Sequence, residues 1–421
     1  MNKTAIYAIV CIVIIAACST VVYSLMSPPS SPSPSPSPSA TATATPSATT
    51  NPAATTTPTA TPDTSVSPTT TPSATATPTP TATPLPPTQQ VTDMVGRTVT
   101  VSNYVTKIVG VNYGCLRLIT YMDASSMVCG VEQTEATSSG RPYAMAHPEY
   151  ANLTKIGPQF GGDPELIAAQ HPDVVFVTDY SKTSADSLQS QLGIPVISIT
   201  YGGLDTAESR QTLYDSFNLI GKVLHKEARA TSLINYINGL VSDLNTRTSS
   251  IADANKPTVY IGGLSSRGAH GFTSTCASYA PFTLTNSKNV ITLEMAKNST
   301  SVVNVDFEAL PSLNPQIIFV DYAGMTLIKS DVQAHLDIFN QLTAVTTGKT
   351  YGVLNYNSYT TNFEIALADA YYVGSVLYPS QFSDINPAQK ADDIYTFMVG
   401  APIYSQMSSL YGPFAPVSIT S

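Results

Sequence analysis

The longest regular pattern of apolar positions lies in residues 226–252, KEARATSLINYINGLVSDLNTRTSSIA. Apolar side chains recur there at the three- and four-residue spacing of an amphipathic helix, at Ala230, Leu233, Ile234, Ile237, Leu240, Val241 and Leu244. At 1.5 Å per residue, a helix over this range would be roughly 40 Å long, about the diameter of a small domain. We therefore predict one long helix that joins two folded halves.

Before this helix, short β-branched runs alternate with helical segments. A hairpin of two strands around a Gly turn is expected at residues 90–101. Further strands are predicted at residues 107–111, 126–131, 174–177 and 196–199, and helices at residues 115–122, 164–170, 184–192 and 206–224. Pro164 suits a first helical position, with Asp163 as its cap. This alternation indicates a parallel sheet with helices on its faces.

The second half of the chain repeats the same pattern. Pro164-Glu165-Leu followed by a Val-rich strand has its counterpart in Phe307-Glu308-Ala followed by Ile317-Ile-Phe-Val. We predict an α/β fold in which two Rossmann-like lobes with central sheets are joined by one long rigid helix. The boundaries are residues 91–222 for the first lobe, 223–254 for the interlobe helix and 255–421 for the second lobe.

The first 26 residues form an export or anchoring segment. Lys3 precedes an apolar run that ends in Ala16-Ala17-Cys18, which is typical of a secretory signal with a lipoprotein-type cleavage site. The apolar stretch is also long enough for an uncleaved membrane helix. Lipidation of Cys18 and a spanning helix both remain open, and either would place the rest of the chain outside the cell, tethered to the membrane. Simple cleavage and release is the less favoured alternative.

Residues 27–90 consist almost wholly of Pro, Ser, Thr and Ala, with Asp63 as the only charged side chain. A segment of this composition lacks the apolar surface needed to offset the entropy of ordering, and its prolines favour extended conformations. We expect a disordered stalk. Its Ser and Thr density suits O-glycosylation, and a bare linker is the alternative.

The charge and the cysteine content reduce the number of function classes that fit this sequence. The net charge is −9 and only 11% of residues are charged, so no basic surface for nucleic acid is expected. Cys115, Cys129 and Cys276 lie in the folded part without CxxC spacing, and a disulfide between the first two stays open. Asn152-Leu-Thr and Asn298-Ser-Thr are glycosylation sequons, which matter only in a host that glycosylates its exports.

From residue 91 to about residue 415 the chain resembles the class III substrate-binding proteins of ABC importers for cobalamin, haem and ferric siderophores. The likeness rests on the opening segment Val91–Val101, on Ile156-Gly-Pro and on Pro172-Asp-Val-Val, together with the long interlobe helix. The tail at residues 355–362 and 378–395 is similar to an archaeal iron-complex branch of that family.

The resemblance implies a transport function. Two lobes would close slightly around the rigid helix on a small ligand, an iron chelate first and a corrinoid as the alternative, with no intrinsic cofactor. One glutamate on each lobe, Glu165 and Glu308, would dock onto arginines of the ABC permease dimer. A carboxylate in a first helical turn is also favoured by the helix dipole alone, by about 0.3 to 1 kcal/mol.

Loops that follow strands are the expected positions of the ligand-binding residues. Arginine can pair with the carboxylates or phosphate of a chelate, and tyrosine offers a flat apolar face with a polar tip. The candidates are Tyr113, Arg141, Tyr143, Arg267, His270, Tyr356 and Tyr359.

Other classes of function find less support in the sequence. His270 could coordinate a metal carried by the ligand, but a single histidine in a Gly-rich loop is more often a hydrogen-bonding residue. No HxH or HExxH pair is present, so a protein-held metal site is not expected. A tethered hydrolase would need Ser265 as nucleophile with His270 and Asp306 or Asp321, yet the GxSxG spacing is missing. A stalked adhesion protein is the remaining alternative, and we do not expect an enzyme.

Overall fold

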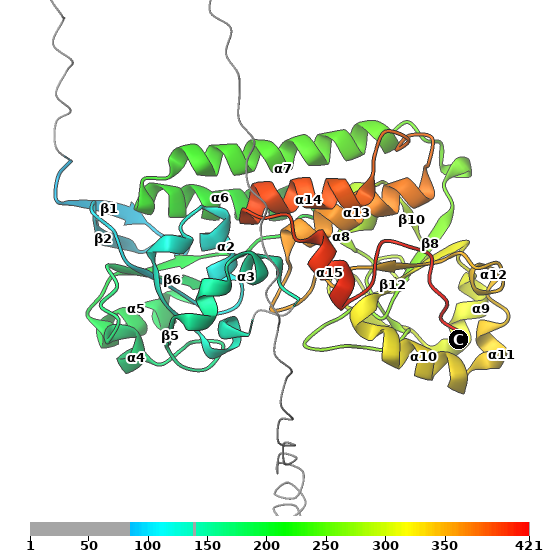
Figure 1. Cartoon of the computed structure of the whole chain (residues 1–421), viewed down its shortest axis with the longest axis horizontal. Coiled ribbons are helices and arrows are strands. Elements are labelled where there is room, and N and C mark those ends of the chain that lie inside the picture. Colours follow the sequence, from blue (N-terminus) through cyan, green and yellow to red (C-terminus); the bar gives the residue numbers. More distant parts are fainter. Residues whose placement is uncertain (1–84, 138–139, 421) are drawn as a thin grey trace, which may run out of the picture. The chain divides into compact units, whose positions relative to one another are not determined.

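The predicted long helix is α7 (Glu227–Thr248), which ends at Thr248 rather than at residue 252. The computed structural model describes residues 85–137 and 140–420. Five of the apolar positions are buried, namely Ala230, Leu233, Ile237, Leu240 and Leu244, whereas Ile234 and Val241 are only partly buried. They pack on α6 (Ala207–Leu224) and α13 (Phe363–Leu377), so α7 borders both lobes (Figure 1).

The first lobe is built on a five-stranded parallel sheet. Its spatial order is β5 (Thr154–Lys155), β4 (Val128–Val131), β3 (Ile108–Val111), β6 (Val174–Thr178) and β7 (Val196–Ile199). β6 is buried along its whole length. Val174 and Phe176 join the main core, whereas Val175 and Val177 pack with buried residues of α4 (Pro164–Ala168) and α5 (Lys182–Leu192). Both faces of the sheet are therefore covered, as the apolar run predicts.

The second lobe has a four-stranded parallel sheet of order β10 (Lys288–Asn289), β8 (Thr258–Gly262), β12 (Ile317–Asp321) and β13 (Thr350–Val353). β12 follows η5 (Phe307–Ala309) and α9 (Leu310–Leu313), just as β6 follows α4. Ile318 and Val320 of β12 alternate with Phe319 between two cores. The two halves thus share one strand–helix–strand arrangement.

The end of the chain closes the outer edge of the second sheet. The Gly352 amide donates to the Ala415 carbonyl at 3.1 Å, and the Val417 amide to the Thr350 carbonyl at 2.9 Å. This pairing occupies the free edge of β13, which the sequence analysis did not anticipate. An edge strand covered in this way cannot pair with another molecule.

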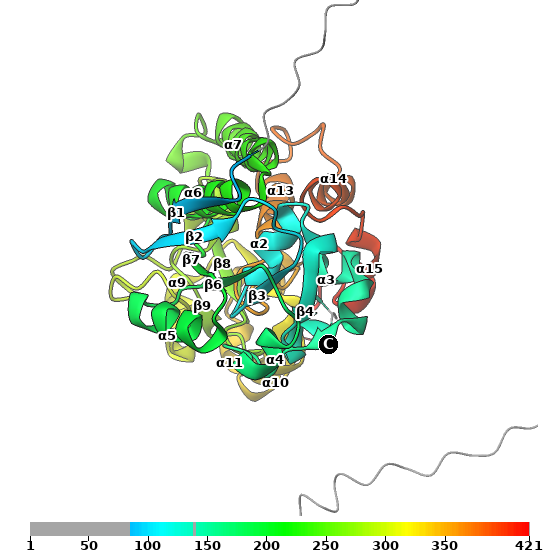
Figure 2. The ribbon, with the colours of Figure 1, turned by 90° about the vertical axis from the view of Figure 1, so that its left-hand side faces the viewer.

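Helices at the C-terminal end connect the lobes. α13 is buried on nearly all sides, and α14 (Pro387–Val399) packs on it and also on α2 (Cys115–Tyr121) and α3 (Pro142–Ala146) of the first lobe. Figure 2 shows α6, α7, α13 and α14 on one side of the first sheet and α5 on the other. These contacts add to α7 as links between the lobes.

The remaining elements are short or peripheral. They are β1 (Thr88–Thr92), β2 (Thr98–Ser102), η1 (Ser125–Met127), η2 (Gln133–Ala136), η3 (Pro148–Asn152), η4 (Asp253–Asn255), β9 (Ser274–Thr275), α8 (Ala280–Leu284), β11 (Val303–Asn304), η6 (Tyr322–Gly324), α10 (Met325–Ala334), α11 (Leu336–Phe339), α12 (Thr343–Thr346) and α15 (Tyr404–Leu410). β1 and β2 form the predicted antiparallel hairpin. β1 begins at Thr88, inside the range predicted as stalk.

The three cysteines of the described residues are free thiols. The thiol of Cys115 donates to the Phe176 carbonyl and that of Cys129 to the Ile108 carbonyl, so no disulfide joins them. The predicted anchor at residues 1–26, Cys18 and the stalk up to residue 84 lie outside the described residues. Within the described ranges, no helix combines the length and apolar character needed to cross a membrane.

Candidate ligand-binding site between the lobes

The first lobe presents polar and aromatic side chains where its parallel strands end. Tyr113 follows β3, Glu132 follows β4, and Asp179 follows β6. Burial, followed by the charge and hydrogen bond of Asp179, raises the pKa of Tyr113 to about 12. The Tyr113 hydroxyl is therefore neutral. It lies at the carboxyl ends of the strands of the first lobe, which is where open parallel sheets bind their ligands.

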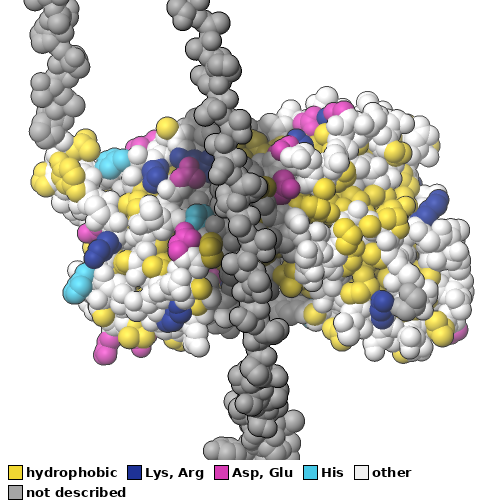
Figure 3. All heavy atoms as spheres, in the orientation of Figure 1, with side chains coloured by type: hydrophobic (Ala, Val, Ile, Leu, Met, Phe, Trp, Pro, Cys, Tyr) yellow, Lys and Arg dark blue, Asp and Glu magenta, His cyan; other side chains and the backbone are white. Residues whose placement is uncertain are grey.

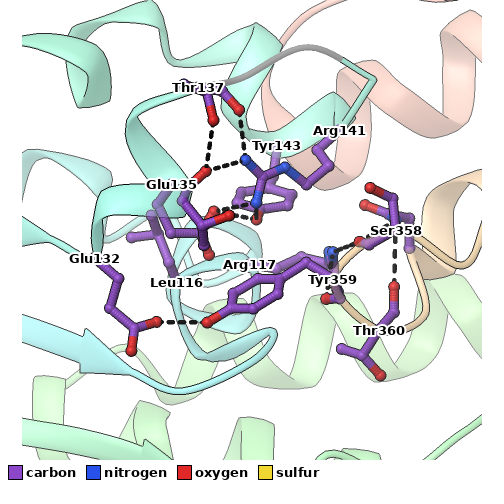
Figure 4. A network of polar contacts seen from close by, with 12 residues as sticks. Leu116, Arg117, Glu132, Glu135, Thr137, Arg141, Tyr143, Ser358, Tyr359 and Thr360 are labelled. Carbon is purple, nitrogen blue, oxygen red and sulfur yellow. Dashed lines mark hydrogen bonds and ion pairs between the residues drawn. The ribbon is translucent and has the colours of Figure 1, made fainter. Parts of the chain in front are cut away.

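A loop of the second lobe reaches these strand ends. We call residues 355–362, between β13 and α13, the strap. Arg117 of α2 is fully buried and donates to three strap carbonyls, those of Ser358 at 2.9 Å, Tyr359 at 3.2 Å and Thr361 at 2.9 Å. It also donates to the Tyr201 hydroxyl, which in turn donates to Thr361. The strap is thus fastened to the first lobe (Figure 4).

Glu132 fixes the side chain of Tyr359. The Tyr359 hydroxyl donates to Glu132 Oε2 at 2.7 Å. Glu132 Oε1 accepts the amides of Gly161 at 2.8 Å and Asn112 at 3.2 Å. Because Glu132 is only 1% exposed, burial raises its pKa. One buried carboxyl group therefore connects two loops of the first lobe to the strap.

Arg141 and Tyr143 lie behind this surface. Arg141 is 4% exposed and forms an ion pair with Glu135 at 2.9 Å, and it also donates to the carbonyls of Thr134 and Thr137. Tyr143 is fully buried and its hydroxyl donates to the same Glu135 carboxylate. The Arg141 guanidinium lies 5.7 Å from the Tyr359 ring centroid. The two residues lie together on Glu135 and expose little surface to a ligand, so their predicted ligand contact stays a prediction.

The candidates of the second lobe differ in accessibility. Arg267 is exposed and forms no ion pair within the described ranges. Its loop meets the strap, because the Asn357 side-chain amide donates to the Ser265 carbonyl at 2.7 Å. His270 Nε2 lies 2.7 Å from the Ser266 carbonyl of its own loop. The ring of Tyr356 lies 5.5 Å from that of Tyr279. Arg267 is therefore the most available cation of this loop.

Glu165 and Glu308 occupy equivalent places. Each is exposed, and each lies in the first turn of the short helical segment that leads into an interior strand of its sheet, α4 before β6 and η5 before β12. Asp163 caps α4 as predicted, by accepting the amides of Glu165 at 2.9 Å and Leu166 at 3.0 Å. Neither glutamate takes part in an ion pair with another described residue. Both are free to meet a partner.

Sequence reasoning missed Phe160, Glu132 and Arg117. Phe160 is 58% exposed, and its ring centroid lies 5.4 Å from that of Tyr359 and 6.4 Å from that of Tyr113. Both Phe160 and Glu132 lie in loops that follow strands, so the rule that selected Tyr113 applied to them as well. Arg117 gave a different signal, a lone cation within the apolar helix CLRLITY.

Two surface hollows lie elsewhere. One, of about 360 Å³, is lined by residues of α6 and α7, including Arg210, Tyr214 and Asn238. The other, of about 400 Å³, lies beside Ile251 and Tyr378. Neither is lined by a predicted ligand residue. On the face shown in Figure 3, the charged side chains of the described residues are dispersed in small groups of mixed sign.

Comparisons with known proteins agree with this architecture. The family model described as "Periplasmic binding protein" matches residues 131–355. A periplasmic solute-binding protein from Veillonella parvula superposes with a TM-score of 0.62 at 20% identity, covering 77% of this chain and 96% of that one. The molybdate-bound structure of MolA from Haemophilus influenzae gives a TM-score of 0.57 at 20% identity, covering 75% and 98% of the two chains.

In sequence, the chain is similar to the molybdate-binding protein MolA of Haemophilus influenzae, with 29% identity over 110 residues. This match covers 26% of the present chain and only 31% of the length of MolA. These relatives are bacterial, and the predicted likeness to an archaeal branch stays a prediction. The family model spans just over half of the residues of this chain, and the chain's fold agrees with that of the superposed structures. The chain therefore belongs to the periplasmic binding protein family, with the class III architecture of ABC transporter substrate-binding proteins.

Proposed function

We propose that this chain is an extracellular, membrane-tethered substrate-binding protein that captures an iron complex between its lobes and delivers it to an ABC importer. The observation that carries the proposal is the strap, through which the second lobe places Tyr359 against Glu132 and Phe160 of the first lobe. Aromatic and hydrogen-bonding groups from both lobes thereby meet at one site, which suits a ligand held between them.

A chelate suits these residues better than a small free oxyanion. The two arginines nearest the strap, Arg117 and Arg141, already donate to buried protein acceptors. A bare oxyanion such as the molybdate of MolA would need these donors free, whereas a large chelate needs apolar faces and a few polar anchors. Tyr113, Phe160 and Arg267 supply such groups. A corrinoid is the alternative ligand of the same type.

The described residues give little support to the metal-binding and hydrolase readings. They contain no group of three or more His, Cys, Asp or Glu side chains that could hold a metal ion. His270 contacts the Ser266 carbonyl, and Asp321 accepts the backbone amide of Ser265 at 3.1 Å, so neither is arranged as the base or orienting acid of a Ser265 nucleophile.

We infer that Glu165 and Glu308 dock the protein onto its partner. Exposed carboxylates at matching positions of two similar lobes suit two equivalent cationic sites, such as those of a permease dimer. The N-terminal segment would hold the protein at the membrane.

Isothermal titration of the full chain against ferric siderophores, haemin, cobalamins and molybdate tests the proposal. We expect sub-micromolar binding of one iron chelate. Binding of a cobalamin alone would select the alternative cargo, and binding of molybdate alone would show an oxyanion carrier. Absence of heat with every compound, from a folded protein, would favour adhesion instead.

A further inference from the structure

The exposed ring of Phe160 forms an aromatic pair across the two lobes. Phe160 belongs to the loop between β5 and α4, whereas Tyr359 belongs to the strap. Their ring centroids lie 5.4 Å apart with an interplanar angle of 43°. Tyr113 adds a third ring at 6.4 Å from Phe160, in an edge-to-face arrangement. Phe160 is 58% exposed, so much of its ring surface is open to solvent and available to a ligand.

Both members of the pair have strained backbones. Phe160 has φ +68° and Tyr359 has φ +52°, in the left-handed region that bulky side chains rarely adopt. Such strain costs of order 1 to 3 kcal/mol per residue and persists where the surroundings enforce it, often at ligand clamps. Here it aims two rings at each other from loops that are distant in sequence.

The two rings are held to very different degrees. Tyr359 is fixed by the hydrogen bond to Glu132, by the Arg141 guanidinium near its ring and by the Arg117 contact to its carbonyl. Phe160 has one polar contact to the strap, a weak amide donation to the Tyr359 hydroxyl at 3.4 Å. The backbone beside Phe160 is held, because the Gly161 amide donates to Glu132 at 2.8 Å. The exposed Phe160 side chain can still rotate away from a fixed Tyr359 without any movement of its loop.

The observed spacing is too small to hold another ring between them. A planar group stacked between two rings needs centroids about 7 Å apart, twice the van der Waals separation of roughly 3.5 Å. An outward shift of Phe160 by about 2 Å would create that space. The hydroxyl of Tyr113, whose ring lies 6.4 Å from that of Phe160, would remain as a polar contact nearby.

We propose that Phe160 and Tyr359 form an aromatic clamp that takes a planar π-system between them, so that the protein selects chelates with aromatic or macrocyclic faces over purely aliphatic ones. This proposal rests on the proposed function, and it names the class of chelate. Phe160 is the mobile jaw and Tyr359 the fixed one, with Glu132 as the residue that positions Tyr359.

Variants of the full chain test the clamp with two probes, a ferric tris-catecholate and a ferric trihydroxamate without aromatic rings. We expect wild-type protein to prefer the catecholate. Phe160→Ala should weaken catecholate binding by about tenfold or more and change hydroxamate binding by less than about twofold. Tyr104→Ala, which removes an equally exposed ring at 59% exposure, should change neither affinity.

The results of these binding measurements distinguish a failure of the clamp proposal from a failure of the proposed importer function. Equal weakening of both probes by Phe160→Ala, or a wild-type preference for the hydroxamate, would overturn the clamp and leave the binding function standing. Failure of both probes, of haemin and of cobalamins to bind would overturn the proposed function and the clamp with it.

A fluorescent variant gives a direct reading of insertion. The chain contains no tryptophan, so Phe160→Trp places a single indole in the mobile jaw. Saturation with the catecholate or with haemin should quench its emission strongly, and the hydroxamate should do so far less. Emission that stays unchanged at saturating catecholate, with binding confirmed by titration, would show that the ligand does not contact this ring.

Discussion

Replacing Arg117 with methionine tests whether the strap is fastened by a buried guanidinium. The side chain is fully buried, and it donates to the carbonyls of Ser358, Tyr359 and Thr361. Methionine keeps most of the apolar stem and removes all of these donors. The strap would lose three hydrogen bonds, although Thr361 keeps the one from Tyr201 and Ser358 the one from Asn362. Burial raises the pKa of the Glu364 carboxyl, and this group would lose the nearby positive charge of Arg117 that opposes the rise.

The expected cost is large. A buried hydrogen bond from a charged donor contributes about 1.5 to 3 kcal/mol, and Arg117 gives three such bonds to the strap. Water entry and protonation of Glu364 would relieve part of this. We therefore expect Arg117→Met to lower the free energy of unfolding by about 3 to 5 kcal/mol.

Urea unfolding of the full chain, followed by far-UV circular dichroism, measures this change. Arg267→Met is the matched control, because Arg267 is exposed and unpaired, and it should change stability by less than about 0.5 kcal/mol. Adding Glu364→Gln to Arg117→Met should recover about 1 to 3 kcal/mol relative to additivity. A loss below about 1 kcal/mol for Arg117→Met would refute the view that this residue holds the strap.

Two further predictions concern buried ionisable groups. Burial raises the pKa of Asp321 from its ordinary 3.8 to about 6, so the native state binds the proton more tightly than the unfolded state does. The stabilisation from this group is complete below about pH 4, and about 3 kcal/mol of it is lost as the pH rises to about 6. Urea titrations at each pH measure this slope of the unfolding free energy against pH, and Asp321→Asn should remove it. A variant slope equal to that of wild type would assign it to other groups. The second prediction is that Cys115 and Cys129 are reduced in native protein. In the folded protein, alkylation without reductant should modify the half-buried Cys129 faster than the fully buried Cys115. After unfolding, mass spectrometry should find both cysteines modified. A mass two hydrogens lower, with both sites unmodified, would indicate a disulfide.

The sequence predicted elements whose pattern is local. The long helix, the first hairpin, the capping of α4 by Asp163 and the apolar strand β6 all follow from the pattern within one segment. The equivalence of the segments around Glu165 and Glu308 also appeared in the sequence, because both lobes use the same order of helix and strand.

The contacts between distant segments could not be predicted in this way. Arg117 and the strap carbonyls are more than 240 residues apart, and nothing in either segment identifies the other as its partner. For the same reason, Arg141 and Tyr143 were assigned to the ligand, although a neighbouring carboxylate, Glu135, already engages both. The chemical groups of a side chain follow from its residue type. Whether another protein residue already binds those groups can be told only from the fold.

Uptake of a radiolabelled iron chelate by cells tests the central claim most directly. Cells that lack this protein should lose uptake of the chelate that the purified chain binds, and the wild-type gene should restore it. A variant with Glu165→Arg and Glu308→Arg should bind the chelate with unchanged affinity and restore no uptake, whereas the control Glu208→Arg, an exposed glutamate in the first turn of α6, should restore it fully. Undiminished uptake in cells without the protein, or full uptake with the double variant, would contradict delivery to an importer through these two glutamates.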